Sequence, residues 1–185
     1  GTKLTGYEVD VAEALAKKLE LKLEWKAVPF DAQLAAVKQD RFDFAIASHG
    51  YTKERAKAVD FASPHYCTGG MIAAPKDGAL TAESLKGKTV GVQLATSYFD
   101  AAKKIPGVRE VKTYKADPDV FSALKAKKID AILSSMSITE QRQKEIDFTD
   151  KLYGTPARLI AAKGATLAPE AAALKPTPIS VSFFS

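Results

Sequence analysis

The chain has 185 residues, of which 46% are hydrophobic, and carries a formal net charge of +5 at pH 7. This composition is typical of a globular protein with a buried core, and no apolar run reaches the roughly 18–20 residues that cross a bilayer. The 27 basic and 22 acidic side chains are interspersed, without a basic stripe between aromatic residues, which argues against nucleic-acid binding.

The first 78 residues alternate between helix-like and strand-like patterns. Val11, Leu15 and Leu19 recur at a spacing of four, which predicts an amphipathic helix over 9–20. Helices between short apolar runs favour a parallel sheet covered by helices. The patterns that follow predict, in chain order, a strand over 23–27, a helix over 31–39, and strands over 42–47 and 71–74.

A segment rich in Pro, Gly and polar residues then separates two predicted lobes. It indicates a linker over 79–87 between a first α/β lobe, 1–78, and a second, 88–165. The second lobe repeats the alternation, which again predicts parallel strands with helices on their faces. Its predicted strands are 88–93, 110–114 and 129–133, and its predicted helices are 98–104 and 120–126.

The two ends depart from this alternation. A strand is expected before the first helix, and residues 1–8 do not supply one. The tail, 166–185, predicts a short Ala-rich helix and an apolar strand over 179–184. This strand would fill the vacant position, in this chain or in a second copy.

An ungapped internal repeat with an offset of 87 residues is the most informative feature. FDFAIASHGYTKERAKAVDFASPHY aligns with IDAILSSMSITEQRQKEIDFTDKLY, so a strand, a Ser-containing loop, a Thr-x-x-Arg turn and an Asp-Phe pair occur twice. A long period with two copies is no solenoid and indicates two lobes facing a cleft. The matched residues are Asp43, Ser48, Thr52, Arg55, Asp60, Phe61 and Tyr66 with Asp130, Ser135, Thr139, Arg142, Asp147, Phe148 and Tyr153.

The repeated turns carry the chemistry of a carboxylate clamp. Thr52 and Thr139 each open a turn that begins like a helix, and helix starts attract anions. Arg55 or Arg142, three residues further on, adds a planar bidentate donor suited to a carboxylate. A solvated arginine that caps its own loop is the alternative for each copy, although the recurrence favours a clamp in at least one. The loops before the turns add the hydroxyl and N–H groups of Ser48, Gly50, Ser135 and Ser137.

Two further positions are candidate ligand contacts. Thr96 or Ser97 is predicted to cap the helix after strand 88–93, and such a cap is either structural or a ligand contact. Phe30 is predicted to be either a core residue or an apolar plate against a ligand side chain.

Enzyme chemistry has little support in the sequence. No Gly-rich phosphate loop, zinc-ligand spacing or Gly-x-Ser-x-Gly motif occurs, and His49, His65 and Cys67 form no recognisable nucleophile and base pair. We therefore expect no catalysis, metal or cofactor, with a dehydratase-like enzyme resting on His49 as an alternative. The single Cys67 excludes an internal disulfide and leaves the redox compartment open.

Several segments resemble the extracytoplasmic solute-binding proteins (family 3) of amino-acid ABC transporters. The resemblance covers residues 1 to about 165 and rests on GYEVDVAEALAKKL, FDAQLAAVKQDRFDFAIAS, YTKERAKAVDFASPHY and LKGKTVGVQLATS. It implies two flavodoxin-like α/β lobes of the type II periplasmic binding protein fold that close on a free amino acid, without catalysis or cofactor. It also implies a membrane permease as partner and a periplasmic or extracytoplasmic location, with the signal peptide absent from this chain.

The resemblance further implies roles for individual residues. Arg55 would hold the ligand α-carboxylate. The other implied contacts are Ser48 and Gly50 in the neighbouring loop, Phe30 as an aromatic plate, and Thr96 with Ser97 as the carboxylate loop of the second lobe.

The second half departs from the family's pattern. Ser135 stands where the family has an aspartate that binds the ligand ammonium group, and residues 120–165 resemble lobe one of lysine/arginine/ornithine- or histidine-binding proteins, with Ser134, Ser135, Ser137 and Arg142 matching the clamp. A recombined or engineered chimera, or a truncated chain, would explain this. We expect weakened or lost amino-acid affinity, because a buried ammonium group without its countercharge is costly. The alternative is a scaffold without a ligand that exchanges its terminal strand to dimerise.

Overall fold

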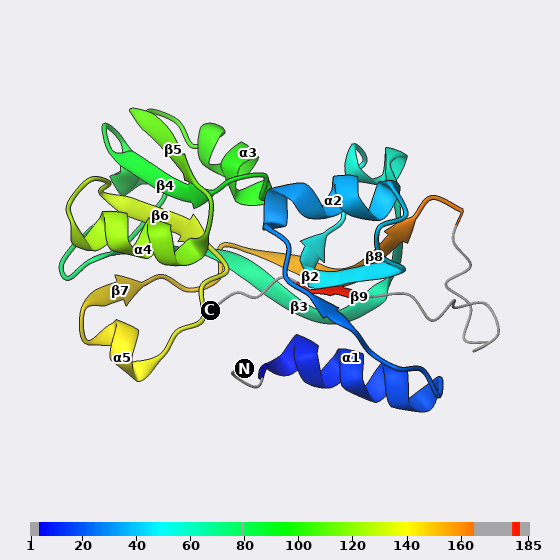
Figure 1. Ribbon diagram of the computed structural model, residues 1–185. Helices are drawn as coiled ribbons and strands as arrows, with labels where there is room; N and C mark the ends of the chain where they lie inside the picture. The colour runs from blue at the N-terminus through cyan, green and yellow to red at the C-terminus, as the bar shows by residue number, and fades with distance from the viewer. Residues whose placement is uncertain (1–3, 79, 165–178, 182–185) are drawn as a thin grey trace. The chain divides into compact units, whose positions relative to one another are not determined.

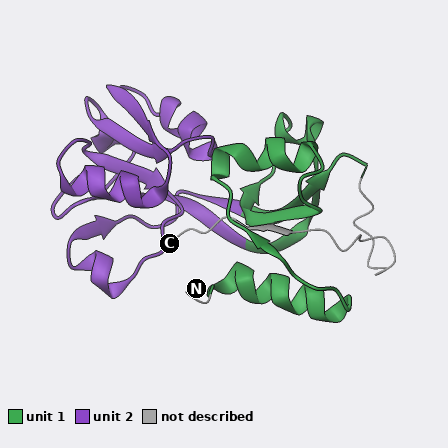
Figure 2. Cartoon of the chain, viewed as in Figure 1, with its two compact units in different colours: residues 1–66, 156–183 green, residues 67–155, 184–185 purple. Residues whose placement is uncertain are grey.

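The computed structural model describes residues 4–78, 80–164 and 179–181 (Figure 1). The chain forms two compact units: unit 1 comprises residues 1–66 and 156–183, and unit 2 comprises residues 67–155 and 184–185 (Figure 2). These boundaries differ from the linker expected at 79–87. The chain passes between the units inside two strands, β3 (Val59–Pro75) and β8 (Tyr153–Ala162), because each continues without a break across a boundary.

Unit 1 is a sheet with a helix on each face. Strand β9 lies between β1 and β2 and is parallel to both, so the strand expected within 179–184 occupies an inner position in the sheet of the same chain. Strand β2 is antiparallel to β8 on its other side. The elements are α1 (Tyr7–Lys18), β1 (Trp25–Lys26), α2 (Phe30–Lys38), β2 (Phe44–Gly50), the 3₁₀ turn η1 (Arg55–Lys57), β9 (Ile179–Val181) and parts of β3 and β8.

Alternation along β2 divides the core of unit 1 in two. Phe44 and Ile46 point to one face and pack with Ala12 of α1, whereas Ala45 points to the other and packs with Val37 of α2. All of these side chains are buried. Because strand side chains alternate with a period of two, a short apolar run can bury both faces of the sheet.

Unit 2 is a second sheet with helices on both faces. Strands β6, β4 and β5 are parallel, and β3 is antiparallel to β6 and β7. The elements are the 3₁₀ turn η2 (Glu83–Leu85), β4 (Thr89–Gln93), α3 (Ser97–Lys103), β5 (Glu110–Tyr114), α4 (Asp117–Lys125), β6 (Ala131–Ser134), α5 (Glu140–Gln143) and β7 (Ile146–Phe148).

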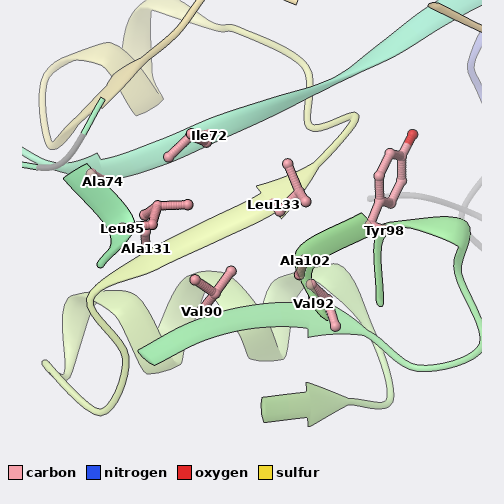
Figure 3. Packing of buried hydrophobic residues seen from close by; sticks show 9 residues of the cluster. All are labelled: Ile72, Ala74, Leu85, Val90, Val92, Tyr98, Ala102, Ala131 and Leu133. Atoms are coloured by element: carbon pink, nitrogen blue, oxygen red, sulfur yellow. The ribbon is translucent and has the colours of Figure 1, made fainter. Parts of the chain in front are cut away.

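Two apolar clusters hold the helices of unit 2 on their sheet. In the first, Val90 and Val92 of β4 pack against Tyr98 and Ala102 of α3 (Figure 3). In the second, side chains of α4 pack on the other face, against Ile132 of β6. The start of α4 is thereby fixed near the carboxyl ends of β4 and β6.

The expected α/β class is confirmed, with three corrections. The sheets are mixed, because β3 and β8 add antiparallel pairs to the expected parallel strands. Ser48, expected in a loop, lies near the end of β2, which continues to Gly50. Strands β7 and β8 and most of β3 were not predicted, and the expected Ala-rich helix of the tail lies outside the described residues.

In each unit, an aspartate of the repeat binds a lysine that directly follows the end of a strand. In unit 1, Asp60 accepts hydrogen bonds from Lys163 Nζ (2.5 Å) and from the backbone N–H of Gly164 (2.8 Å). In unit 2, Asp147 accepts hydrogen bonds from Lys76 Nζ (2.5 Å) and from the backbone N–H of Asp77 (3.2 Å). The lysine hydrogen bonds hold the pKa of both carboxyls below its usual range. The offset of 87 also relates the two lysines, so the aspartate of each copy binds the strand end of the other.

Gly91, in the middle of β4, leaves no room for a side chain. A Cβ there would lie 2.3 Å from Ile129 Cδ1 and 2.9 Å from Val120 Cγ1, both on buried residues. We expect Gly91→Ala to lower the free energy of unfolding by about 1–3 kcal/mol, measured by urea denaturation. Gly154→Ala is the control, because its Cβ would meet nothing closer than 3.9 Å. An unchanged unfolding midpoint in Gly91→Ala would contradict this packing.

Candidate functional site

The first Thr-x-x-Arg turn folds back over the end of β2. Thr52 Oγ1 accepts a hydrogen bond from the Arg55 N–H (3.1 Å), and Arg55 Nη1 donates to the Gly50 carbonyl (2.9 Å). The guanidinium carbon of Arg55 also lies 5.7 Å from the centroid of the Phe30 ring. A carbonyl and an aromatic face therefore hold the guanidinium in one orientation.

The second turn has the same geometry in unit 2. Thr139 Oγ1 accepts from the Arg142 N–H (3.2 Å), and Arg142 Nη1 donates to the Ser137 carbonyl (2.9 Å). Thr139 is the N-cap of α5, as the sequence predicts. Each arginine thus does cap its own loop. This alternative does not exclude the clamp, since a guanidinium has five N–H donors and the bond to the loop uses one.

Phe30 covers a buried histidine instead of standing exposed as a plate. The Phe30 side chain is 4% exposed, and its ring stacks on that of His49 with centroids 4.6 Å apart. His49 Nε2 lies 2.8 Å from Gln33 Oε1, and Gln33 Nε2 donates to the Val28 carbonyl (3.0 Å). This bond fixes the amide of Gln33, so His49 carries its proton on Nε2, and Nδ1 is an acceptor with no donor in the described structure.

His49 is neutral at physiological pH. Its burial, and then the positive charge of Arg55, lower the pKa of His49 from 6.5 to about 3. An imidazole with this pKa is not poised for proton transfer near pH 7. The dehydratase alternative, which rested on His49, therefore loses its chemical basis.

Ser48 is held by a polar cluster that the sequence analysis missed. Its N–H donates to Glu8 Oε1 (2.8 Å) and its Oγ to Glu8 Oε2 (3.1 Å), and Oγ also shares a short hydrogen bond with Tyr66 OH. His65 Nε2 lies 2.9 Å from Glu8 Oε1. Ser48 has a φ of 53°, in the left-handed region, which these bonds help to maintain. An acidic residue in the first turn of a helix is the one sequence signal at Glu8.

The hydroxyls of unit 2 gather at the carboxyl ends of β4 and β6. Thr96 is the N-cap residue of α3, but its Oγ1 donates to the Gln93 carbonyl (2.7 Å) and makes no cap bond, in contrast to the prediction. Ser97 begins α3, and Ser135 follows β6 directly. Of the nine predicted contacts, Phe30, Ser48, Gly50 and Arg55 lie in unit 1, and Thr96, Ser97, Ser135, Ser137 and Arg142 lie in unit 2.

Other kinds of site find no support in the described part of the chain. Across residues 4–78, 80–164 and 179–181, no three His, Cys, Asp or Glu side chains gather in a way that could hold a metal ion. Over the same residues, no helix has the length and apolarity needed to cross a membrane. Cys67, the single cysteine, is exposed.

The sequence profile of bacterial extracellular solute-binding proteins, family 3, matches residues 1–110 and, in a second stretch, 86–176. The chain belongs to this family. Its relatives are solute-binding proteins and not enzymes, in agreement with the expectation from the sequence.

The individual relatives bind different amino acids, according to their names. The L-cystine-binding protein TcyJ of Escherichia coli K12 is 38% identical over 135 residues, which cover 71% of this chain and 50% of TcyJ. A "probable histidine-binding protein" of Campylobacter jejuni is 35% identical over 135 residues, covering 72% and 52%. The chain spans about half the length of these curated relatives.

Solved structures of arginine-binding proteins share the fold. An ancestral arginine-binding protein bound to arginine has a TM-score of 0.81 and 31% identity, over 88% of this chain and 76% of that one. The holo form of ArgBP from T. maritima has a TM-score of 0.80 and 26% identity, over 87% of this chain and 74% of that one. The α/β architecture is thus that of solved amino-acid receptors.

The neutral state of His49 makes the fold sensitive to acid. Below pH 6.5 the unfolded chain binds a proton at His49, whereas the folded chain does not until about pH 3. The stability that depends on neutral His49 is therefore complete above pH 6.5 and falls as the pH is lowered towards 3, by up to about 1.4 kcal/mol per pH unit.

We expect His49→Gln, which cannot titrate, to flatten this dependence. The measurement is the urea unfolding midpoint of both proteins between about pH 7 and about pH 5. Equal slopes in the wild type and the variant would show that His49 does not titrate on unfolding.

Proposed function

We propose that the chain binds a free amino acid and that Arg55 is its principal carboxylate contact. The observation that carries this proposal is the orientation of the Arg55 guanidinium by the Gly50 carbonyl and the Phe30 ring. A planar donor held in this way loses little conformational entropy when it binds a carboxylate. Family membership supports the ligand class, because relatives are named for cystine, histidine and arginine.

The support for the other predicted ligand contacts differs from residue to residue. Ser137 and Arg142 repeat the geometry of the first turn, which supports a second carboxylate-binding arrangement in unit 2. Thr96, Ser97 and Ser135 stand at strand ends, where ligands of α/β sheets bind. The hydroxyl of Ser48 is already bonded to Glu8 and Tyr66, so we propose that Ser48 supports the end of β2.

We further propose an extracytoplasmic location and delivery of the amino acid to an ABC transporter permease. The family profile describes extracellular proteins, and one solved relative is the substrate-binding protein of an amino-acid ABC transporter. The overlapping profile matches, 1–110 and 86–176, are those that a chimera of two such proteins would produce. Because Ser135 replaces an expected aspartate, we propose affinity weaker than that of an intact receptor.

Isothermal titration calorimetry against cystine, histidine, arginine, lysine, glutamine and glutamate tests the function. We expect saturable heat with a Kd above about 1 μM for at least one amino acid. Arg55→Ala should weaken binding roughly 10- to 100-fold, because it removes a charge-assisted hydrogen bond. Arg55→Lys should recover only part of this loss, since an ammonium group cannot form the bidentate contact.

Arg142→Ala is the matched comparison, because the same turn is altered in the other unit, and it should weaken binding less than Arg55→Ala since Arg55 is the principal contact. A loss confined to Arg142→Ala would transfer the carboxylate contact to unit 2 and contradict the role of Arg55. Absence of heat with every amino acid, from a folded sample, would overturn the proposed function and leave the scaffold without a ligand.

A further inference from the structure

Unit 2 contains a buried oxygen that has no hydrogen-bond donor. Gln93, the last residue of β4, is 6% exposed, and its Nε2 donates to the Lys115 carbonyl (3.3 Å). A carbonyl can only accept, so the amide orientation is fixed, and Gln93 Oε1 is the atom left without a donor among the described residues. Burying an unsatisfied acceptor lowers the stability of the folded chain.

The side chain of Gln93 lies on the face of the sheet that α4 covers. Gly91 shares this face, because side chains alternate along a strand, and a Cβ at Gly91 would meet Val120 of α4. The bond from Gln93 to the Lys115 carbonyl directs the amide towards the connection between β5 and α4. Asp117, two residues beyond Lys115, is the first residue of α4.

Ser134 brings β6 to the same place. It shares its face with Ile132, which packs against α4, and Ser134 Oγ lies 3.4 Å from Asp117 Oδ1. Two neighbouring parallel strands and the start of α4 therefore gather an amide oxygen, a hydroxyl and a carboxylate at the carboxyl end of the sheet.

The charge at this place is negative and poorly compensated. Burial raises the pKa of Asp117, while the Ser134 hydroxyl and the more distant charge of Arg142 act in the opposite direction. Among the described residues, no Lys, Arg or His nitrogen lies within the 4.0 Å of an ion pair with Asp117, although eight such pairs occur elsewhere. The group that would satisfy both Gln93 Oε1 and Asp117 is a cation with several N–H donors.

We propose that Gln93 Oε1 and the Asp117 carboxylate bind the ammonium group of a ligand within unit 2. An ammonium group has three donors and a full positive charge, which match an orphan acceptor beside a carboxylate. The choice of ligand rests on the proposed function. Asp117 would supply the countercharge that Ser135 does not, from the start of α4 instead of the end of β6.

The test uses an amine without a carboxylate, so it does not depend on Arg55. We titrate the full chain with n-butylammonium chloride, with sodium butyrate as the matched anion and sodium chloride for ionic strength, and follow the Gln93 side-chain amide by ¹⁵N-edited NMR. We expect a saturable shift of this signal with n-butylammonium and none with butyrate. For the variants, backbone amide signals that shift in the wild type report binding.

Three variants test whether Gln93 and Asp117 bind the n-butylammonium ion. Gln93→Leu and Asp117→Asn should each weaken n-butylammonium binding at least tenfold. Asp119→Asn, an exposed acid in the same turn of α4, should leave it unchanged. The spread of backbone amide signals verifies that each variant is folded.

The outcomes separate this inference from the proposed function. An unshifted Gln93 amide in the wild type, or binding retained in both Gln93→Leu and Asp117→Asn, overturns the ammonium site whatever calorimetry finds with amino acids. A saturable shift lost in those variants supports the site even where no amino acid gives heat, and in that case only the proposed function fails.

Discussion

The fold depends on two strands that each belong to both units. Strand β3 begins in unit 1 and ends in unit 2, where it pairs with β6 and β7, and β8 begins in unit 2 and ends in unit 1, where it pairs with β2. Each sheet therefore needs residues from both halves of the chain. Ion pairs hold the ends of these two strands: Lys163, after the end of β8, binds Asp60, and Lys76, after the end of β3, binds Asp147. Non-local pairing of this kind, and not a linker, decides where one unit stops.

The exchange explains why one local motif occurs in two different environments. Both Thr-x-x-Arg turns form the same two hydrogen bonds, so the turn itself determines the position of the arginine. The surroundings differ: Arg55 lies against Phe30, which covers neutral His49, whereas Arg142 acts on the half-buried carboxyl of Asp117. The two turns place the same donor in each unit, and the neighbouring elements give each copy its own electrostatic setting.

The sequence predicted correctly the helices and strands whose apolar pattern lies within their own residues. The strand over 110–114 was predicted to the residue, as β5, and α1, α2 and α4 to within a few residues, because their apolar periods are clear. The length of β3 and the existence of β8 escaped prediction because partners distant in the chain stabilise them. Glu8 was missed for the same reason, since its contacts with Ser48 and His65 are 40 and 57 residues away.

Among the described residues, the buried side-chain acceptors without a hydrogen-bond partner include His49 Nδ1 in unit 1 and Gln93 Oε1 in unit 2. Both lie near candidate ligand contacts, because His49 lies behind the ring that contacts Arg55, and Gln93 is bonded to the carbonyl of Lys115, two residues before Asp117. An enclosed acceptor such as His49 Nδ1 lowers stability without return, and burial together with the charge of Arg55 keeps its imidazole neutral. An acceptor at the end of a sheet is different, because a ligand's N–H donors can satisfy it, and the cost carried by the empty protein is then recovered as affinity. Binding sites in α/β sheets are where such acceptors are most readily tolerated, since the carboxyl ends of the strands are the edge that a ligand covers.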